Sequence, residues 1–402
     1  MFDEHVLGSV LDVFRLRQYF NVVVRGRDVV AGLRDDAGFL DDMRRALVPL
    51  PFVDAWPAPV SPFPRSRSID EPASPKRIAL LATGGSGALA SVVGVARAFE
   101  DRGMRPSLIS LCSGSALFGF PIASGLPADD VARFTLGLRP RDYVDVDWRR
   151  LALLVPTLAR GFAGVIRGER LEATYRDLLG DMTLAEMPVP AYAPIWNVEE
   201  NRVEFLGPRT HPNVTVARAV RMAVSLPLFL EPVELGGFSW CDGGIVDIFP
   251  VLPALEIEPQ PDAAVAVNGF YPRDFIGEDA RGWERRSFSI VTVAGQVRTC
   301  QQVQLARVNV QRLRAALPVA MIEPVPYEKV RGLGFYRQFL NNREWPEFMR
   351  AGRAAAARAL DSLGISRHGT TPGPQRGGSG LGGAGGASRA ASISDLSVSA
   401  ST

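Results

Sequence analysis

Three short segments of this chain combine a hydroxyl, a carboxylate and a row of backbone N–H donors. They are the glycine-rich segment TGGSGAL (83–89), the serine-containing segment LCSGSALFG (111–119) and the carboxylate-containing segment WCDGGIVDIFPV (240–251). Each segment follows or ends a short apolar run that is typical of a buried strand. Loops at the carboxyl ends of strands share one edge of an open α/β sheet, so we expect the three segments to converge.

The glycine-rich segment offers N–H groups to an anion. Gly84, Gly85, Ser86 and Gly87 lead into a predicted helix, where the first N–H groups are unpaired and carry partial positive charge. Three interpretations stay open from the residues alone. They are a simple turn, a phosphate site without the lysine of a Walker motif, and an oxyanion hole for a tetrahedral acyl intermediate.

Ser113 and Asp242 are the candidate nucleophile and base. A serine at the start of a helix is by default an N-cap, and an Asp-Gly pair is by default a turn. A sharp strand-to-helix turn with a hydroxyl at its tip is also how α/β proteins present a nucleophile. The usual G-x-S-x-G pattern of that turn is not present around Ser113.

The elements that must position these segments follow from hydrophobic periodicity. Apolar strands over 76–82 and 107–112 alternate with helices, which is the pattern of parallel βαβ units. Further strands are predicted over 190–200, 202–207, 264–270, 287–295 and 319–326, and helices within 128–180 and over 215–227, 296–317 and 345–364. The pattern predicts an α/β fold.

Composition divides the chain into three parts. Residues 1–75 form an N-terminal extension that ends in a proline-rich linker (49–75) with eight prolines. Residues 76–365 form the folded domain. Residues 366–402 are rich in Gly and Ser, and we expect a disordered tail there because the segment lacks apolar residues to bury.

The overall composition excludes several classes of protein. A net charge of +2 with no basic arm argues against nucleic-acid binding. Cys112, Cys241 and Cys300 form no C-x-x-C pair or disulfide framework, which favours a reducing compartment. The sequence carries no signal-peptide pattern at its first residues and no run of about 18 uncharged apolar residues. We therefore expect a cytoplasmic protein that binds no metal.

Taken together, the three segments resemble the patatin-like phospholipase family. That family shows a glycine-rich oxyanion loop, a G-x-S-x-G elbow and an Asp-Gly-Gly segment in this order, here 84–87, 111–115 and 242–244. The helix and strand GVARAFEDRGMRPSLIS, the stretch AVRMAVSLPLFLEPVEL and the closing helix AGRAAAARAL are also similar to the family. The resemblance covers about residues 76–365.

The resemblance implies a three-layer α/β/α sandwich and a lipid acyl hydrolase of the phospholipase A type. An ungapped register from Gly94 to Ala116 places Ser113 on the family's nucleophile, whereas Ser115 requires a two-residue shift. The family uses a Ser-Asp dyad, which implies Asp242 as the base and Gly84 to Gly87 as the oxyanion hole. No cofactor or metal is implied, and the implied partner is a lipid ester substrate.

The few histidines of the chain fit a dyad better than a triad. His5 lies at the terminus, His368 opens the tail, and His211 lies in the polar loop GPRTHPN. A carboxylate base needs partial desolvation to raise its proton affinity, and apolar residues flank Asp242 on both sides.

Five positions depart from the family pattern. Leu111 and Ser115 replace the elbow glycines, and Ser86, Ala88 and Ile248 replace a glycine, a basic residue and an asparagine that are common in the family. Two alternatives therefore stay open beside the lipid acyl hydrolase. One is a soluble ester or thioester hydrolase, and the other is a catalytically silent protein of this family that binds lipid.

The sequence also allows a contact between one segment and a membrane. Residues 151–171 are apolar and carry three arginines, Arg160, Arg167 and Arg170, so they fit either a peripheral contact with an anionic bilayer or a buried helix pair.

Overall fold

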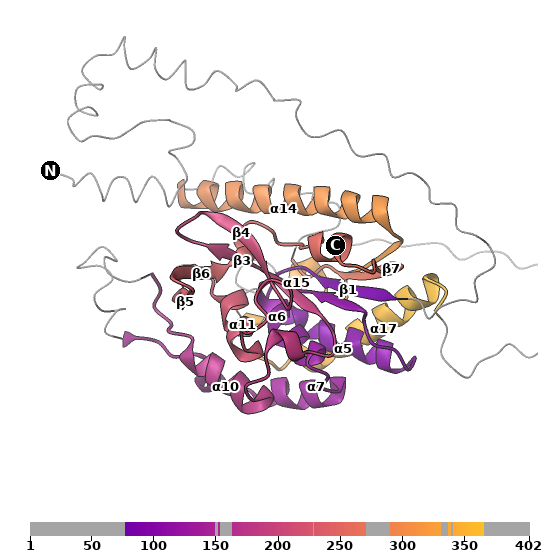
Figure 1. Cartoon of the computed structure of the whole chain (residues 1–402), viewed down its shortest axis with the longest axis horizontal. Coiled ribbons are helices and arrows are strands. Elements are labelled where there is room, and N and C mark those ends of the chain that lie inside the picture. The colour runs from indigo at the N-terminus through magenta and orange to yellow at the C-terminus, as the bar shows by residue number, and fades with distance from the viewer. Residues whose placement is uncertain are drawn as a thin grey trace, which may run out of the picture. The chain divides into compact units, whose positions relative to one another are not determined.

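The computed structural model describes residues 77–148, 152, 163–227, 229–270, 290–330, 337–338 and 341–365 (Figure 1). The predicted N-terminal extension, its linker and the C-terminal tail lie outside these residues, as does most of the apolar segment 151–162. Contacts divide the chain into Met1–Ser366 and Arg367–Thr402, and all described residues belong to the first unit.

Eight strands form one mixed sheet in the order β5-β6-β3-β2-β1-β7-β8, and β4 pairs with β3. The strands joined by parallel pairs are β1 (Ile78–Ala82), β2 (Leu108–Ser110), β3 (Ala191–Asn197), β7 (Ala263–Val267) and β8 (Val319–Ile322). Antiparallel pairs join β4 (Arg202–Leu206), β5 (Val233–Leu235) and β6 (Phe238–Asp242) to this core. The predicted α/β fold with a mostly parallel sheet is confirmed.

Helices cover both faces of the sheet (Figure 1). The α-helices are α5 (Ser91–Glu100), α6 (Ala116–Ala123), α7 (Ala128–Gly137), α8 (Pro140–Tyr143), α10 (Glu169–Leu179), α11 (Val216–Val224), α12 (Leu252–Glu256), α14 (Ile290–Ala316), α15 (Tyr327–Val330) and α17 (Trp345–Ser362). Single 3-10 turns are η1 (Gly87–Ala90), η2 (Ser113–Ser115), η3 (Leu184–Glu186) and η4 (Gly243–Ile245).

The central strand β1 shows why two layers of helices are needed. Its side chains alternate, so that Ile78, Leu80 and Ala82 pack on one face of the sheet and Ala79 and Leu81 on the other. The first face is buried under α5, α6, α11 and α17, and the second under α12 and α14. Because both faces are covered, the whole strand is apolar, as the sequence predicts.

The strand predicted over 287–295 is wrong from Ile290 onward. Residues 290–295 instead form the first turns of α14, which continues without a break to Ala316. The β-branched run IVTV suggested a strand, but β-propensity is weak and depends on context. Extending a helix that already exists adds one hydrogen bond for each residue fixed, and this outweighs the local preference.

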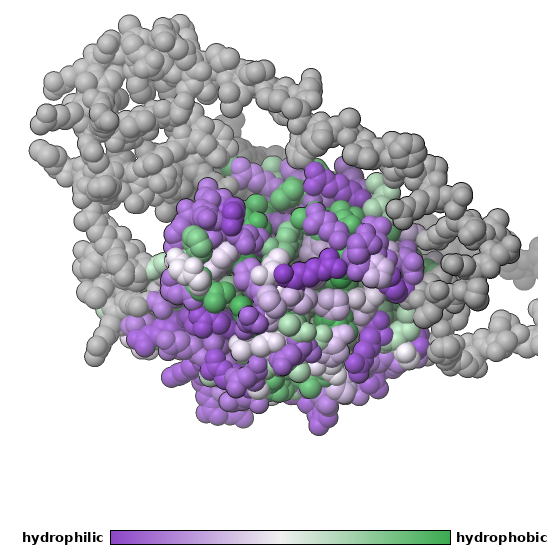
Figure 2. All heavy atoms as spheres, in the orientation of Figure 1, coloured by the Kyte–Doolittle hydropathy of each residue, from purple (hydrophilic) through white to green (hydrophobic). Residues whose placement is uncertain are grey.

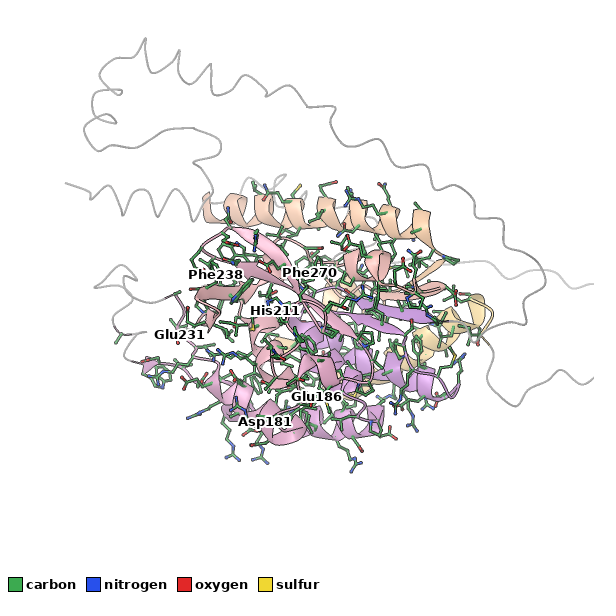
Figure 3. All side chains as sticks on the ribbon, in the orientation of Figure 1. Asp181, Glu186, His211, Glu231, Phe238 and Phe270 are labelled. Carbon is green, nitrogen blue, oxygen red and sulfur yellow. The ribbon has the colours of Figure 1, made fainter. Side chains whose placement is uncertain are left out.

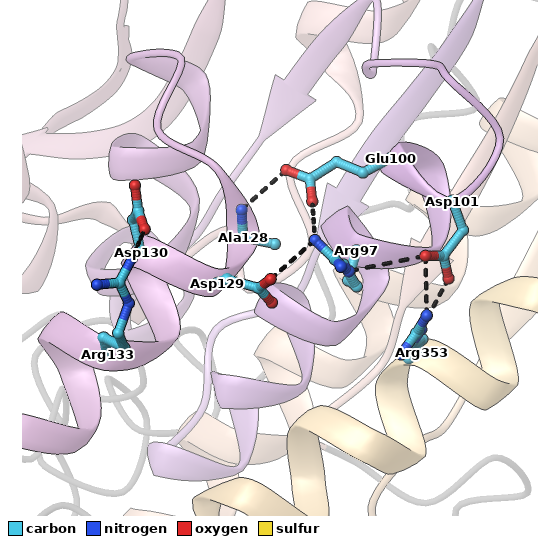
Figure 4. A network of polar contacts seen from close by, with 8 residues as sticks. All are labelled: Arg97, Glu100, Asp101, Ala128, Asp129, Asp130, Arg133 and Arg353. Atoms are coloured by element: carbon cyan, nitrogen blue, oxygen red, sulfur yellow. Dashed lines mark hydrogen bonds and ion pairs between the residues drawn. The ribbon is translucent and has the colours of Figure 1, made fainter.

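A network of ion pairs joins α5 to α7 and α17 (Figure 4). Arg97 lies 3.2 Å from Glu100, 3.0 Å from Asp129 and 3.6 Å from Asp101. Asp101 in turn accepts two hydrogen bonds from Arg353 at 2.7 and 2.8 Å. These groups are partly exposed, so each pair contributes only about 0–1 kcal/mol and the network chiefly fixes the alignment of the helices.

A buried arginine closes the domain at its C-terminal end. Arg102 is 2% exposed, and its guanidinium donates hydrogen bonds to the carbonyls of Ala98, Ala357 and Ile365. Because a buried charge must be fully hydrogen-bonded, this side chain ties the end of α17 to α5.

Polar side chains cover most of the face seen in Figure 2, with small apolar areas between them. The large exposed hydrophobic residues of the described part are Trp148, Phe229 and Leu252. No helix in this part of the chain combines the length and the apolar character needed to cross a membrane.

Two glycines let α5 and α17 touch through their backbones. A Cβ atom on Gly94 would lie 1.8 Å from the Met349 carbonyl oxygen, and one on Gly352 would lie 2.1 Å from the Ser91 carbonyl oxygen. The obstructing atoms belong to the backbone of the facing helix, so they cannot rotate away.

We expect Gly94→Ala and Gly352→Ala each to lower the free energy of unfolding by about 1–3 kcal/mol through overpacking. The measurement is urea unfolding followed by circular dichroism. Gly137→Ala is the matched control, because a Cβ there meets nothing within 4 Å. An equal effect of all three substitutions would contradict the close approach of the helices.

Candidate active site

Ser113 lies at the tip of a sharp turn between β2 and α6. Its φ is 49°, in the left-handed region, and Asn201 is the other non-glycine residue of the described part with positive φ. Ser113 does not act as a cap, because Cys112 and Ser115 occupy the N-cap positions of η2 and α6. A strained, partly exposed serine at a strand-to-helix turn has the geometry of a nucleophile elbow.

Ser115 uses its hydroxyl inside the turn. The buried Ser115 Oγ accepts a hydrogen bond from the Cys112 N–H at 2.7 Å and donates one to the Cys112 carbonyl at 2.8 Å. Both hydrogen bonds stay within the turn that carries Ser113. The serine that replaces an elbow glycine therefore stabilises the elbow, and its hydroxyl is not available for attack.

The bulky Leu111 is accommodated by a glycine eight positions later. A Cβ atom on Gly119 of α6 would lie 2.2 Å from one methyl carbon of Leu111 and 2.7 Å from the other. Leu111 is fully buried in the core under α6. The leucine at the elbow is thus accommodated by a glycine on helix α6, and not by a glycine at the end of the strand.

Asp242 ends β6 with its carboxylate almost fully buried, at 1% exposure. Its Oδ1 accepts a hydrogen bond from the Gly244 N–H at 2.8 Å, and its own N–H donates to the Ser225 carbonyl at the end of α11. The side-chain acceptor makes Asp242 the N-cap of η4.

The structure brings Ser113 and Asp242 together around Gly244. A Cβ atom placed on Gly244 would lie 2.9 Å from Asp242 Oδ1 and 3.5 Å from Ser113 Cβ. Both atoms therefore border the same small space, although 129 positions separate the residues in sequence. The convergence of two of the three motif segments follows from this geometry.

The glycine-rich loop approaches the same elbow. A Cβ atom on Gly114 would lie only 2.2 Å from the Gly85 carbonyl oxygen, so the loop and the elbow are in backbone contact. The Gly84 N–H is already used, because it donates to the Ile248 carbonyl at 2.8 Å. Within the described residues, the N–H groups of Gly85, Ser86 and Gly87 have no hydrogen-bond partner.

The members of this loop differ in their surroundings. Ser86 is fully buried, and its hydroxyl has no hydrogen-bond partner. Gly87 starts η1 and packs away from the elbow, since a Cβ atom there would lie 2.1 Å from the Gln338 carbonyl and 2.4 Å from Trp345 Nε1. Gly85 and Ser86 both lie close to the elbow, since a Cβ atom on Gly114 would also lie 3.5 Å from the Ser86 carbonyl oxygen.

A second carboxylate, Asp247, was not singled out from the sequence as a site residue. Burial raises the pKa of the Asp247 carboxyl to about 6, while hydrogen bonds from the Phe249 N–H and the Asn309 amide act in the opposite direction. The Asn309 Nδ2 donates to Asp247 Oδ1 at 2.9 Å. The sequence signal is an amide within the apolar stripe of a helix, which predicts a polar partner across the interface.

Cys112 and Cys241 are free, buried thiols. Cys112 Sγ donates to the Asp247 carbonyl at 3.5 Å and borders the space beside Gly244. Burial and the charges of Asp242 and Asp247 raise the pKa of the Cys112 thiol well above its ordinary value. Among the described residues, no group of three or more His, Cys, Asp or Glu side chains is placed to hold a metal ion.

His211 contacts an aromatic residue of β6. Its ring meets the Trp240 ring edge-on, with the centroids 5.7 Å apart (His211 is labelled in Figure 3). Burial lowers the pKa of His211, and its Nδ1 has no hydrogen-bond partner. The hydrogen bonds and ring contacts of His211 include none with Ser113.

Residues 80–255 match a family model described as patatin-like phospholipase. This stretch contains the glycine-rich loop, the elbow and the Asp-Gly-Gly segment.

The chain is also similar to curated proteins over part of its length. Uncharacterized NTE family proteins of Mycobacterium tuberculosis and Mycobacterium bovis are 27% identical over 210 residues, which is 52% of this chain and 53% of theirs. YqhO of Bacillus subtilis, an uncharacterized protein, is 25% identical over 188 residues, 40% of this chain and 61% of that protein. The chain spans about half the length of the mycobacterial relatives.

Two solved structures align with part of the chain. VipD from Legionella pneumophila aligns with a TM-score of 0.43 at 15% identity, covering 72% of this chain and 68% of that one. Human GIVD cytosolic phospholipase A2 aligns with a TM-score of 0.37 at 10% identity, covering 72% and 62%.

The contact between Leu111 and Gly119 predicts a strong coupling between the two positions. Gly119→Ala alone should lower the free energy of unfolding by about 1–3 kcal/mol, because the new methyl group has no room. In a Leu111→Ala background the same change should be neutral or stabilising, since alanine favours the helix by about 1 kcal/mol over glycine. A double-mutant cycle by urea unfolding measures the coupling. An equal cost in both backgrounds would show that the two residues do not compete for space.

The raised pKa of Asp247 predicts a pH-dependent stability. The Asp247 carboxyl binds a proton more tightly in the folded protein than in the unfolded chain. Its contribution to the free energy of unfolding is therefore fully present below about pH 4 and is lost as the pH rises through 6. From pH 4 to pH 7 the free energy of unfolding of the wild type should therefore fall by up to about 2 kcal/mol relative to that of Asp247→Asn.

Urea unfolding of both proteins at several pH values tests this difference. The control is Asp177→Asn, which replaces an exposed carboxylate on α10. The difference between its free energy of unfolding and that of the wild type should be the same at every pH. A difference between the wild type and Asp247→Asn that stays constant across the pH range would refute the raised pKa.

Proposed function

We propose that the chain is a lipid acyl hydrolase of the phospholipase A type, on the premise that residues 80–255 match a family model described as patatin-like phospholipase. The proposed machinery is a dyad of Ser113 and Asp242. The observation that carries the proposal is the strained backbone of Ser113 beside the Asp242 carboxylate, with Gly244 between them.

In the proposed first step, the Ser113 Oγ attacks the carbonyl carbon of a lipid ester while its proton passes to Asp242. Asp242 suits this role because it is buried, and partial desolvation raises the proton affinity of a carboxylate. The hydrogen bond from the Gly244 N–H to Oδ1 orients the carboxylate at the space that it shares with Ser113.

The negative charge that forms on the carbonyl oxygen needs preorganised donors. The N–H groups of Gly85 and Ser86 are the proposed donors, together with the N–H of Gly114, the residue after the nucleophile. The Gly85 carbonyl oxygen is in contact with Gly114, so the loop and the elbow that carry these donors adjoin each other. Gly84 then supports the loop through its hydrogen bond to Ile248, and Gly87 anchors the start of η1.

Collapse of the tetrahedral intermediate breaks the ester bond, and the leaving alcohol takes the proton from Asp242. Water then attacks the acyl-enzyme, gives a proton to Asp242 and releases the fatty acid, after which the proton returns to Ser113 Oγ. No cofactor takes part in the proposed cycle. The substrate is proposed as a membrane or micellar lipid ester, which makes a peripheral contact with lipid part of the proposal.

We expect Ser113→Ala and Asp242→Asn each to lower kcat/KM for lipid ester hydrolysis by about 10⁴-fold or more. The double mutant should be little worse than either single mutant, because the two residues act as a unit. His211→Ala is the control and should keep most of the activity. The measurement is fatty acid release from a panel of lipid classes, with folding checked by circular dichroism.

A fluorophosphonate probe decides among the alternatives. Peptide mapping by mass spectrometry should find the label on Ser113 and not on Ser115. Labelling at Ser113 with turnover of short-chain esters or thioesters only would favour a soluble hydrolase. No labelling, together with binding to lipid vesicles, would favour a catalytically silent lipid-binding protein.

A further inference from the structure

Helix α14 presents two buried amides to the segment that follows Asp242. Gln302 and Asn309 are 8% and 5% exposed and lie seven residues apart, so they share one face of the helix. The same face packs Val303, Ala306 and Leu313 against the sheet. A polar group in such an apolar stripe costs free energy unless it is hydrogen-bonded, so the partners of the two amides identify what the helix supports.

Gln302 holds the residue that orients the candidate base. Its Nε2 donates to the Gly244 carbonyl oxygen at 2.5 Å, across 58 positions of sequence. The N–H of the same Gly244 donates to Asp242 Oδ1 at 2.8 Å. Glycine has the widest range of backbone conformations, so a glycine that must aim its N–H at one atom needs restraint from outside.

Asn309 fixes the other end of the same segment. Its Nδ2 donates to Asp247 Oδ1 and to the Phe249 carbonyl, both at 2.9 Å. The segment from Asp242 to Phe249 is therefore attached to α14 at two points, two helical turns apart.

From this chain of hydrogen bonds we infer that Gln302 is a positioning residue for Asp242 and acts through Gly244. The inference rests on the proposed function for its effect on catalysis, and on geometry alone for its effect on Gly244. Within the described part of the chain, the hydrogen bond of Gln302 goes to Gly244 and none joins it to Ser113. Its role is to keep the Gly244 N–H aimed at the carboxylate when the proton arrives.

A purely structural role for Gln302 predicts a different outcome. If the amide only satisfies a buried carbonyl, its loss lowers stability and leaves the folded protein with normal kcat. If it positions the base, its loss lowers kcat in fully folded protein while KM stays nearly constant, because ground-state binding does not involve Asp242.

The test compares Gln302→Met with Gln304→Leu. Methionine has nearly the shape of glutamine but no N–H donor, and Gln304 is an exposed residue of the same helix. We expect Gln302→Met to lower kcat by about 10²-fold with KM within about twofold, as a small misplacement of a catalytic group does. Gln304→Leu should match the wild type. The assays run at a temperature where thermal unfolding shows each variant fully folded.

Hydrogen–deuterium exchange provides a second readout that does not depend on activity. Peptides that cover 242–249 should exchange faster in Gln302→Met than in the wild type, and unchanged in Gln304→Leu. If Gln302→Met does not fold, Gln302→Asn replaces it, because this amide is one methylene too short to reach the Gly244 carbonyl.

The outcomes separate this inference from the proposed function. An inactive wild type would overturn the proposed function, while faster exchange at 242–249 would still support the restraint of Gly244 by Gln302. An active wild type with unchanged kcat and unchanged exchange in Gln302→Met would overturn the inference alone. Equal losses in Gln302→Met and Gln304→Leu would overturn it as well.

Discussion

The left-handed backbone of Ser113 is the constraint on which the candidate site depends. A non-glycine residue in this conformation costs about 1–3 kcal/mol and persists only where its surroundings hold it. Here the Ser115 hydroxyl closes the turn through both polar groups of the Cys112 backbone, and the Leu111 N–H extends the sheet by donating to the Tyr192 carbonyl. The turn is thus held from inside and from the neighbouring strand. This explains why glycines two positions before and two positions after the serine are not required in this chain.

Close packing at the site depends on glycines that leave room for a neighbouring residue. Leu111 fills space that any side chain at Gly119 would take, and the backbone contact of Gly85 with Gly114 leaves no room for a Cβ at residue 114. Interiors packed at crystal-like density tolerate a change of one methyl group poorly, so such pairs are strongly coupled. The elbow, the glycine-rich loop and α6 therefore form one packed unit, and a substitution that changes side-chain volume in one of them alters the packing of the others.

The sequence predicts the elements and the convergence of the motifs better than it predicts the hydrogen bonds at the site. Apolar runs place β1 and β2 correctly because both faces of these strands are buried. The helix over 290–295 is missed because local β-propensity is overruled by the continuity of α14. The role of Ser115 depends on where one hydroxyl points, and the use of the Gly84 N–H depends on the position of Ile248, 164 residues away. Neither is encoded in a local pattern. The apolar stripe of α14 indicates that Gln302 and Asn309 need polar partners, but it does not identify those partners, which lie in another segment.

The charges around the elbow also bear on the state of the thiol that lies next to Ser113. Cys112 immediately precedes Ser113, and a thiolate there would be a strong nucleophile. Burial and the carboxylates of Asp242 and Asp247 raise the pKa of the Cys112 thiol, so it stays protonated and packs between the two loops. A neighbouring carboxylate acts in this sense on any acidic group, because it disfavours the negatively charged form. Burial and the two carboxylates thus keep the Cys112 thiol protonated, while the neighbouring Ser113 hydroxyl lies at the partly exposed tip of the turn.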